Sequence, residues 1–417
     1  MCNKKNNALS RRQVLGGTSV AAASTFLSTK PAARSFLGTG GDKDVYVQIF
    51  LRGAMDGLTT VVPYADGDLY TARPTLAVPP PGQTNGALDL DGFFGLAPSA
   101  AGLMTPYQAG HLAFVHASGS TDPTRSHFDA FANMELGSPN MPPGALADGW
   151  LARYLHQVAA PGQSILRGVG AGDLLPLGFA GAPGSLPIPD FANFAFPGNP
   201  VTLDLRVDKL KEMYTDIAAP VGAAALNTFD SIDLMATVDF AGYVPANGAQ
   251  YPTSELGMRM RNIAAVIKAD IGIEVINVDV HGWDLHAQLG PLDGAMAMML
   301  NDLSLSLLAF YLDMGTGIDG VTLCCMSEFG RRVEENSSQG IDHGHGNAMI
   351  LMGGHIAGGS VFANWPGLAP AQLDQGDLAI TIDYRDIVGE FLGQRLGATD
   401  LGAIFPGHAF TTHGVTV

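Results

Sequence analysis

The residues of this 417-residue chain that are best suited to chemistry gather in its C-terminal half. Four of the eleven histidines lie between positions 281 and 345, and carboxylates are interleaved with them. The set is His281, Asp284, His286, Glu328, Asp342, His343 and His345. Imidazoles mixed with carboxylates suit Zn²⁺, Mn²⁺ or Fe better than Ca²⁺, which takes oxygen ligands. We therefore expect a divalent metal site, with Zn²⁺ as the first choice and Mn²⁺ or Fe as alternatives.

Each fragment of this set also has an ordinary structural explanation. His281 and His286 could be solvated loop residues, and Glu328 precedes two arginines with which it could form a surface ion pair. In the N-terminal half, Asp56 follows an expected strand and is a further candidate ligand, although Asp before Gly is also common in turns. His343-Gly-His345 is the strongest fragment, because two imidazoles one residue apart can converge on an ion.

The nucleophile has two candidates. Ser126 stands where a helix is expected to begin, so free N–H groups and the helix dipole would favour an anion there. Serine in that position is also a common N-cap. Thr121 is the rival, because Thr121-x-Pro-x-Arg125 places a hydroxyl before a guanidinium suited to bidentate phosphate or sulfate binding. His127 would assist the reaction or merely cap the turn.

The elements that must position these residues alternate between strands and helices. Apolar, β-rich runs predict strands at 44–51, 111–117, 273–280, 321–326 and 348–352. Helical patterns occupy 129–136, 207–217, 254–269, 291–314 and 383–395, the last capped by Asp383. This order predicts an α/β fold, a doubly wound and mainly parallel sheet with helices on both faces. Ligands bind such sheets outside the carboxyl ends of the strands, where the polar clusters are expected to lie.

Beyond the first 34 residues, we expect a single α/β domain from 35 to 417. Residues 138–200 are rich in Gly, Pro, Ala and Phe and show little periodicity. They are expected to form a loop-rich insertion packed over the sheet. Cys324 and Cys325 are adjacent in an apolar run and are expected to be small core residues rather than redox or metal groups.

The first 34 residues contain six basic residues and no acidic one. Residues 10–15 (SRRQVL) resemble a twin-arginine export signal, and the weakly apolar stretch after them is too short to span a membrane. A signal anchor is the alternative interpretation. We expect residues 1–34 to be a signal peptide, the twin-arginine (Tat) translocon to be a partner during export, and the mature protein to be periplasmic or secreted without being an integral membrane protein.

Composition excludes several other classes. Only 15% of residues are charged while 47% are apolar, which is the opposite of the balance in disordered chains. The net charge is −17, from 22 basic and 39 acidic residues, and removal of the six N-terminal cations makes it about −23. A surface this acidic argues against nucleic acids and anionic membranes as main partners.

Taken together, the motifs resemble a large bacterial family of exported proteins of unknown function within the alkaline phosphatase and sulfatase superfamily. Besides the twin arginines, they are Gly53-Ala-Met-Asp-Gly57, Arg125-Ser-His-Phe128, Asp279-Val-His-Gly-Trp-Asp-Leu-His286, Ser327-Glu-Phe-Gly-Arg331 and Asp342-His-Gly344. They spread over nearly all of the mature chain.

The resemblance implies an alkaline-phosphatase-like fold with two metal positions at the strand ends and a Ser or Thr nucleophile between them. By position, Asp56 is similar to the superfamily's first metal aspartate, and His281, Asp284 and His286 are similar to its middle ligands. Glu328 stands where an Asp-His pair usually occurs, with Phe329 in place of a ligand histidine. His343 or His345 would be the last ligand. One or two ions are therefore expected.

These expectations lead to a function. The leading hypothesis is an exported metal-dependent hydrolase of small or polymeric phosphate, sulfate or phosphonate esters. Ser126 or Thr121 would be its nucleophile, and Arg125 would hold the anionic group. The alternative is a non-catalytic exported protein that keeps the superfamily fold as a scaffold for binding. Phe329 at a ligand position and the loop-rich segment 138–200 are the features that favour the alternative.

Overall fold

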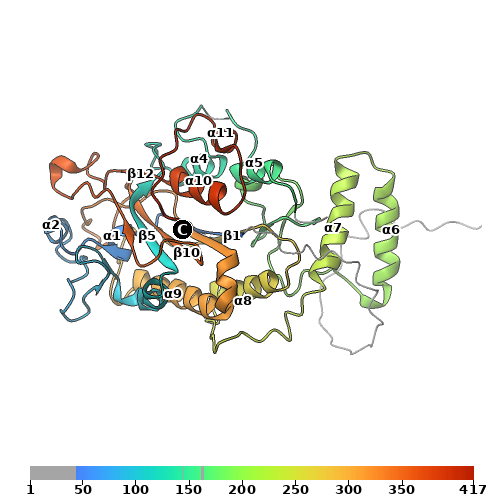
Figure 1. The fold of residues 1–417 in the computed structure, drawn as a ribbon, viewed down its shortest axis with the longest axis horizontal. Helices are drawn as coiled ribbons and strands as arrows, with labels where there is room; N and C mark the ends of the chain where they lie inside the picture. Colours follow the sequence, from blue (N-terminus) through green and yellow to red (C-terminus); the bar gives the residue numbers. More distant parts are fainter. Residues whose placement is uncertain (1–43, 143, 161–163) are drawn as a thin grey trace, which may run out of the picture. The chain divides into compact units, whose positions relative to one another are not determined.

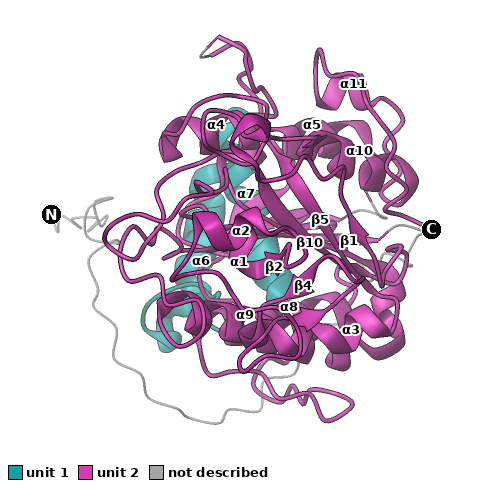
Figure 2. Ribbon diagram, turned by 90° about the vertical axis from the view of Figure 1, so that its left-hand side faces the viewer, with its two compact units in different colours: residues 1–35, 193–237 teal, residues 36–192, 238–417 magenta. Residues whose placement is uncertain are grey.

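The computed structural model describes residues 44–142, 144–160 and 164–417. The expected signal peptide, with its twin arginines, lies outside the described residues. The chain divides into two compact units (Figure 2). The described part of the smaller unit is residues 193–237, which contain α6 (Leu203–Thr215) and α7 (Val221–Met235). The larger unit contains every candidate site residue that the sequence singled out.

A nine-stranded sheet forms the centre of the larger unit (Figure 1). Its order is β11 (Val361–Phe362), β5 (Leu112–Gly119), β10 (Asn347–Gly353), β9 (Val321–Met326), β1 (Val45–Leu51), β8 (Val275–Val280), β6 (Gly168–Gly170) and β7 (Ser185–Pro187), with β12 (Ile382–Asp383) also paired to β5. Within the described sheet β10 alone runs antiparallel to its neighbours, β5 and β9. The predicted α/β class with a mainly parallel sheet is confirmed.

The reversal of β10 has a direct consequence for the site. In a parallel strand, the loop that follows the strand lies at the carboxyl edge of the sheet. Because β10 is antiparallel to β9, the loop that precedes it lies at this edge instead. That loop carries His343 and His345, so they reach the edge where β1, β8 and β9 end.

The central strands are buried because helices cover both faces of the sheet. Every residue of β5, β9 and β10 is buried, as is typical of strands between two helical layers. Helices α8 (Glu255–Lys268) and α9 (Ala295–Met314) lie on one side of the sheet. On the other side lie α4 (His127–Leu136), α5 (Trp150–Gln157), α10 (Tyr384–Gln394) and α11 (Leu401–Ile404) (Figures 1 and 2).

Helix α9 is long and apolar enough, by length and composition, to cross a membrane. In the fold, however, half of its apolar window is buried, and it packs against α8 and the short 3-10 helix Pro98–Leu103. Its apolar character is therefore explained by packing against the sheet and neighbouring helices.

The main strands and helices lie within a few residues of their predicted positions, and Asp383 caps α10 by accepting a hydrogen bond from the N–H of Arg385. Residues 138–200 differ from the loop-rich expectation. They contribute α5 and two strands, β6 and β7, that extend the sheet beyond β8. Strands of only three residues are too short to show the alternation by which a strand is recognised.

Further elements were not predicted. They include α7, α1 (Gly57–Thr60), α2 (Asp68–Ala72), α3 (Met104–Gln108) and a small second sheet of β2 (Val61–Val62), β4 (Gly95–Leu96) and β3 (Leu88–Asp89). The second sheet is antiparallel, and β2 lies directly after Asp56-Gly57 and α1.

Candidate metal centre

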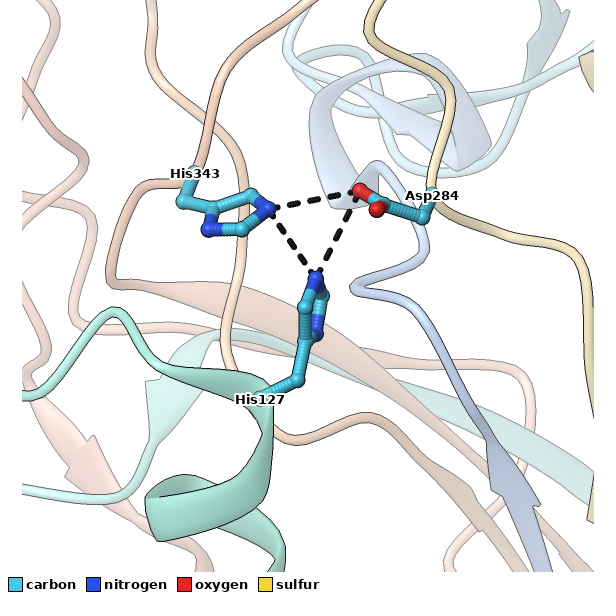
Figure 3. Close-up of side chains that lie close together, drawn as sticks. All are labelled: His127, Asp284 and His343. Carbon is cyan, nitrogen blue, oxygen red and sulfur yellow. Dashed lines mark hydrogen bonds and ion pairs between the residues drawn. The ribbon is translucent and has the colours of Figure 1, made fainter.

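Three side chains from distant parts of the chain point toward one another at the carboxyl edge of the sheet (Figure 3). The Nε2 atoms of His127 and His343 are 3.0 Å apart. The Oδ1 atom of Asp284 lies 3.5 Å from His127 Nε2 and 3.3 Å from His343 Nε2. One ligand atom from each residue therefore lies within reach of a common point.

His286 adds a fourth donor to this group. Its Nε2 atom is 2.9 Å from His343 Nε2 and 3.0 Å from Asp284 Oδ1. His286 therefore contacts two members of the group, whereas the ligand atoms that all lie within 4.8 Å of one another are those of His127, Asp284 and His343. We call His127, Asp284, His286 and His343 the four-residue cluster.

The Nδ1 atom of each cluster histidine forms a hydrogen bond with an oxygen on the side of the ring opposite the cluster. Nδ1 of His127 donates to Glu328 Oε1 at 2.6 Å, and Nδ1 of His286 donates to Asp342 Oδ1 at 2.9 Å. Nδ1 of His343 donates to the backbone oxygen of Arg125 at 2.8 Å. Because these oxygens are acceptors, the hydrogen of each neutral ring is on Nδ1 and the Nε2 lone pair faces the cluster.

This arrangement fits a metal ion. Two Nε2 lone pairs 2.9 to 3.0 Å apart cannot bond to each other, so the contacts are favourable only with a proton or another cation between them. Histidines whose second nitrogen donates to a carboxylate or a carbonyl oxygen are the usual pattern around protein-bound transition metals. Two imidazoles and a carboxylate, with the imidazole of His286 beside them, suit Zn²⁺ or a similar divalent ion.

The electrostatics agree with this interpretation. The hydrogen bond to Glu328 raises the pKa of His127, because the carboxylate stabilises the charged ring. Partial burial lowers the pKa of His343. Burial would raise the pKa of Asp284, but the hydrogen bond and the charge of Arg331 outweigh this effect and hold that pKa below its ordinary value. Asp284 is therefore an anion ready to bind a cation.

Arg331 ties the loops of the site together. Its side chain is buried and donates to the backbone oxygens of Gly53 and Ala54, which follow β1, and of Ile341, which precedes β10. It also donates to Asp284 Oδ1 at 2.7 Å. One guanidinium therefore joins the loops of three strands and orients one cluster residue.

Glu328, predicted as a ligand, supports the cluster from the second layer. Its Oε1 accepts from His127 and from the N–H of Gly53, and its Oε2 accepts from the hydroxyl of Ser327. Its buried carboxylate thus contacts the Nδ1 side of His127, away from the Nε2 atom that faces the cluster. Asp342 likewise contacts His286 rather than the centre. The hydrogen bond from His286 lowers the pKa of Asp342, which keeps it charged.

Asp56 lies outside the cluster. Its carboxylate forms a two-pronged ion pair with Arg73, with distances of 2.6 and 3.1 Å, and the two side chains are only 2% and 1% exposed. Arg73 also donates to the backbone oxygens of Val333 and Arg332. Burial would raise the pKa of Asp56, but the Arg73 charge and hydrogen bonds lower it overall.

The two remaining predicted ligands also lie elsewhere. His281 is exposed and lines a separate small cavity of about 220 Å³ together with Glu255, Arg259 and Asp302. His345 Nδ1 bonds to Asp374 at 2.9 Å, and its Nε2 faces the backbone oxygen of Asp122. Neither histidine contacts the cluster residues by any hydrogen bond in the described structure.

The candidate catalytic residues follow β5 in the loop that leads to α4. Ser126 is the N-cap of α4, and its Oγ accepts from the N–H of Asp129 at 3.5 Å. Thr121 accepts from Asn140. The guanidinium of Arg125 pairs with the buried carboxylate of Asp377, so it is the backbone oxygen of Arg125, rather than its side chain, that contributes to the cluster.

His127 belongs to the cluster, although the sequence predicted it as an assistant to the nucleophile or a turn cap and not as a metal ligand. Its sequence neighbours suggested an assistant to the nucleophile, because Arg125-Ser-His127 has none of the spacing of a metal motif. The ring stacks on Phe329, with centroids 4.9 Å apart, so the phenylalanine that stands at an expected ligand position supports a ligand instead. Arg73 had no signal in the sequence at all.

Comparisons with known proteins add little about activity. Residues 207–404 match the model of a family described as a protein of unknown function (DUF1501). This range includes Asp284, His286 and His343 but excludes His127. No curated protein gives a significant match.

Several solved structures are distantly similar to the chain. Ps i-CgsB in complex with k-i-k-neocarrahexaose has a TM-score of 0.38 and 9% identity over 88% of this chain and 74% of that chain. PH0037 protein from Pyrococcus horikoshii has a TM-score of 0.31 and 11% identity over 89% and 99%. The lipoteichoic acid synthase LtaP from Listeria monocytogenes has a TM-score of 0.32 and 9% identity over 84% and 77%. Likenesses at these scores say nothing of what this chain does.

Proposed function

We propose that this protein is an exported metal-dependent hydrolase of phosphate or related sulfate and phosphonate esters. The four-residue cluster would hold a divalent transition metal, with Zn²⁺ as the first choice. The observation that carries the proposal is the convergence of the Nε2 atoms of His127 and His343 with Asp284 Oδ1, while the Nδ1 atom of each cluster histidine bonds to an oxygen. His286 Nε2 lies beside His343 and Asp284.

The exposed fractions of the four side chains show which side of the cluster is open to solvent. The side chains of His127 and His343 are 20% and 23% exposed, whereas those of Asp284 and His286 are 45% and 44% exposed. An ester would therefore approach past Asp284 and His286, with His127 and His343 forming the floor. A bound ion supplies a lowered pKa for a water or hydroxyl and polarises the ester oxygen.

The hydroxyl nearest to the cluster in the sequence is that of Ser126. It lies between Arg125, whose carbonyl holds His343, and His127 itself. Its long N-cap hydrogen bond costs little to break, and the N-terminus of the ten-residue α4 favours a negative charge. On this basis we propose Ser126 as the nucleophile, with Thr121 and a water molecule as the alternatives.

One observation favours the non-catalytic scaffold as a second candidate. The guanidiniums of Arg125 and Arg331 are both used by carboxylates of the chain, Asp377 and Asp284. Neither is free to hold the anionic group of a substrate. A metal-binding scaffold would need no such residue, so the two candidates must be separated by activity.

The first experiment is elemental analysis of protein purified after export in its native host, followed by anomalous scattering. We expect the ion at the four-residue cluster, and we expect His127→Ala and His343→Ala to lose it. His281→Ala is the matched control, since His281 is in the same loop as Asp284 but outside the cluster, and it should keep the ion. Protein that is folded and binds no transition metal would overturn the proposal.

The second experiment separates enzyme from scaffold. The metal-loaded protein is assayed against p-nitrophenyl esters of phosphate, sulfate and phosphonate. Hydrolysis that disappears in His343→Ala and persists in His281→Ala supports the enzyme. Bound metal without hydrolysis of any ester supports the scaffold.

A further inference from the structure

If the proposed function is correct, the surroundings of Asp56 bear on the number of ions that the site holds and on the charge of its substrate. Asp56 is the expected ligand of one of two metal positions. The carboxylate of Asp56 receives two hydrogen bonds from the buried guanidinium of Arg73, which also bonds to two backbone oxygens. A cation therefore already stands where a second ion would be needed.

A metal ion bound where Arg73 meets the two oxygens of Asp56 would displace Arg73. The displaced guanidinium would remain almost fully buried without its partner, which is strongly unfavourable. Among the residues that the structure describes, the one group with metal-ligand geometry is the cluster that contains His127, Asp284 and His343. The structure therefore provides for one ion.

The charges around this ion balance. The two positive charges of a bound divalent ion, together with the charge of Arg331, would face three carboxylates, Asp284 within the cluster and Glu328 and Asp342 behind its histidines. The neighbouring pairs Arg73 with Asp56 and Arg125 with Asp377 each cancel internally. The loaded site is then close to neutral, and the chain around it is acidic, with a net charge of −17.

We propose that the site holds one metal ion and prefers singly charged esters, such as phosphate diesters or sulfate monoesters, over doubly charged phosphate monoesters. A neutral site offers no net positive charge to a second negative charge on the substrate, and the acidic surface repels a dianion more than a monoanion. The reaction consumes one water: its oxygen ends on phosphorus or sulfur, the bond to the leaving oxygen breaks, and the leaving alkoxide receives a proton.

The number of ions is tested by elemental analysis with native mass spectrometry. We expect one transition metal ion per chain. The double variant Asp56→Asn with Arg73→Gln replaces the ion pair by a neutral hydrogen-bonded pair, and it should keep that ion. Two ions per chain in the parent protein, or loss of an ion in a double variant that circular dichroism shows to be folded, would overturn the inference.

The charge preference is tested with three esters of the same leaving group at pH 8. They are p-nitrophenyl phosphate, bis(p-nitrophenyl) phosphate and p-nitrophenyl sulfate. We expect kcat/KM to be at least tenfold higher for one of the monoanions than for the dianion, and Asp342→Asn, which removes one negative charge, to narrow this ratio. Preference for the phosphate monoester overturns the inferred charge preference and leaves the proposed function standing. No hydrolysis of any ester overturns the proposed function together with the charge preference, whereas the number of ions is decided by the elemental analysis alone.

Discussion

Glu328 and Asp342 each accept a hydrogen bond from the Nδ1 atom of a cluster histidine, but their surroundings differ. Glu328 is buried and accepts three hydrogen bonds, whereas Asp342 is about half exposed and also accepts from Asn336. Both carboxylates fix the tautomer of a ring whose Nε2 faces the cluster. Water can replace the exposed partner more easily than the buried one.

This difference predicts an order of metal affinities. We expect Glu328→Gln to weaken metal binding by about 10- to 100-fold, and Asp342→Asn to weaken it less. Competition with a chromogenic chelator measures both. Asp374→Asn is the control, because Asp374 holds His345, which is outside the cluster. Equal losses in all three variants would show that the effect is general rather than transmitted through His127 and His286.

Two single-residue variants can identify the nucleophile. We expect Ser126→Ala to lower kcat by 100-fold or more, on the order of the loss seen when a catalytic group is removed, while metal content stays unchanged. Thr121→Ala should keep nearly full activity, because its hydroxyl is engaged by Asn140. Full activity in both variants would instead indicate that a water molecule attacks the ester.

At the scale of elements, the site depends on loops that meet at one edge of the sheet, and Arg331 connects them. Arg331→Lys retains the charge but cannot reach the oxygens of Gly53, Ala54 and Ile341 together. We expect the free energy of unfolding to fall by about 3 kcal/mol, since several hydrogen bonds to a charged group are lost. Metal affinity should fall as well.

Arg332→Lys is the control for this prediction. Arg332 is the next residue, but its side chain is about one-third exposed and bonds mainly to the backbone oxygen of Gln375. Its replacement should change the free energy of unfolding by no more than about 0.5 kcal/mol. Urea denaturation followed by circular dichroism measures both variants, and equal effects would contradict the connecting role of Arg331.

His116 links two further elements and makes stability depend on pH. It lies in β5, is fully buried, donates from Nε2 to the backbone oxygen of Val61 in β2, and accepts at Nδ1 from the N–H of Ala117. Burial lowers its pKa to about 4, against about 6.5 in the unfolded chain. The unfolded state therefore takes up a proton first as the pH falls.

The stabilising contribution of neutral His116 is complete above pH 6.5 and is lost as the pH falls from 6.5 toward 4, by about 3 kcal/mol in total. His116→Gln should flatten this part of the curve of unfolding free energy against pH, measured by urea denaturation between pH 7 and pH 4. A slope equal to that of the parent protein would exclude His116 as its source.

For the whole molecule, the expected signal peptide affects the net charge of the mature chain. The basic residues of the N-terminal 34 offset part of the acidic charge, and their removal would leave the mature chain at about −23. An acidic mature protein favours solubility and attracts cations. This negative charge surrounds a metal site whose own charges would nearly cancel.

We predict that the protein is exported through the twin-arginine route. Replacing Arg11 and Arg12 with Lys should retain the protein in the cytoplasm, with its length unchanged, as seen by cell fractionation and intact mass. The parent protein should appear in the periplasm or the medium, shortened near residue 34. Unchanged export of the double variant would contradict the twin-arginine signal.

Much of this molecule follows from local information in the chain. Apolar runs of β-branched residues place the buried strands, turn residues mark where they end, and the rule that ligands bind at carboxyl strand ends locates the site. For that reason Asp284, His286 and His343 were among the predicted ligands. The sequence also contained the correct α/β class, because alternating strand and helix patterns permit few other arrangements.

The tertiary structure decided which polar residues meet. His127 and His343 are 216 positions apart, and they approach only because β10 runs against its neighbours and turns its leading loop to the same edge. The pairing of Asp56 with Arg73 depends on a buried contact between loops, which no local pattern encodes. An aspartate in the cluster, such as Asp284, and an aspartate that pairs with an arginine, such as Asp56, look the same in the sequence. Only the position of the neighbouring charged group in the fold distinguishes them.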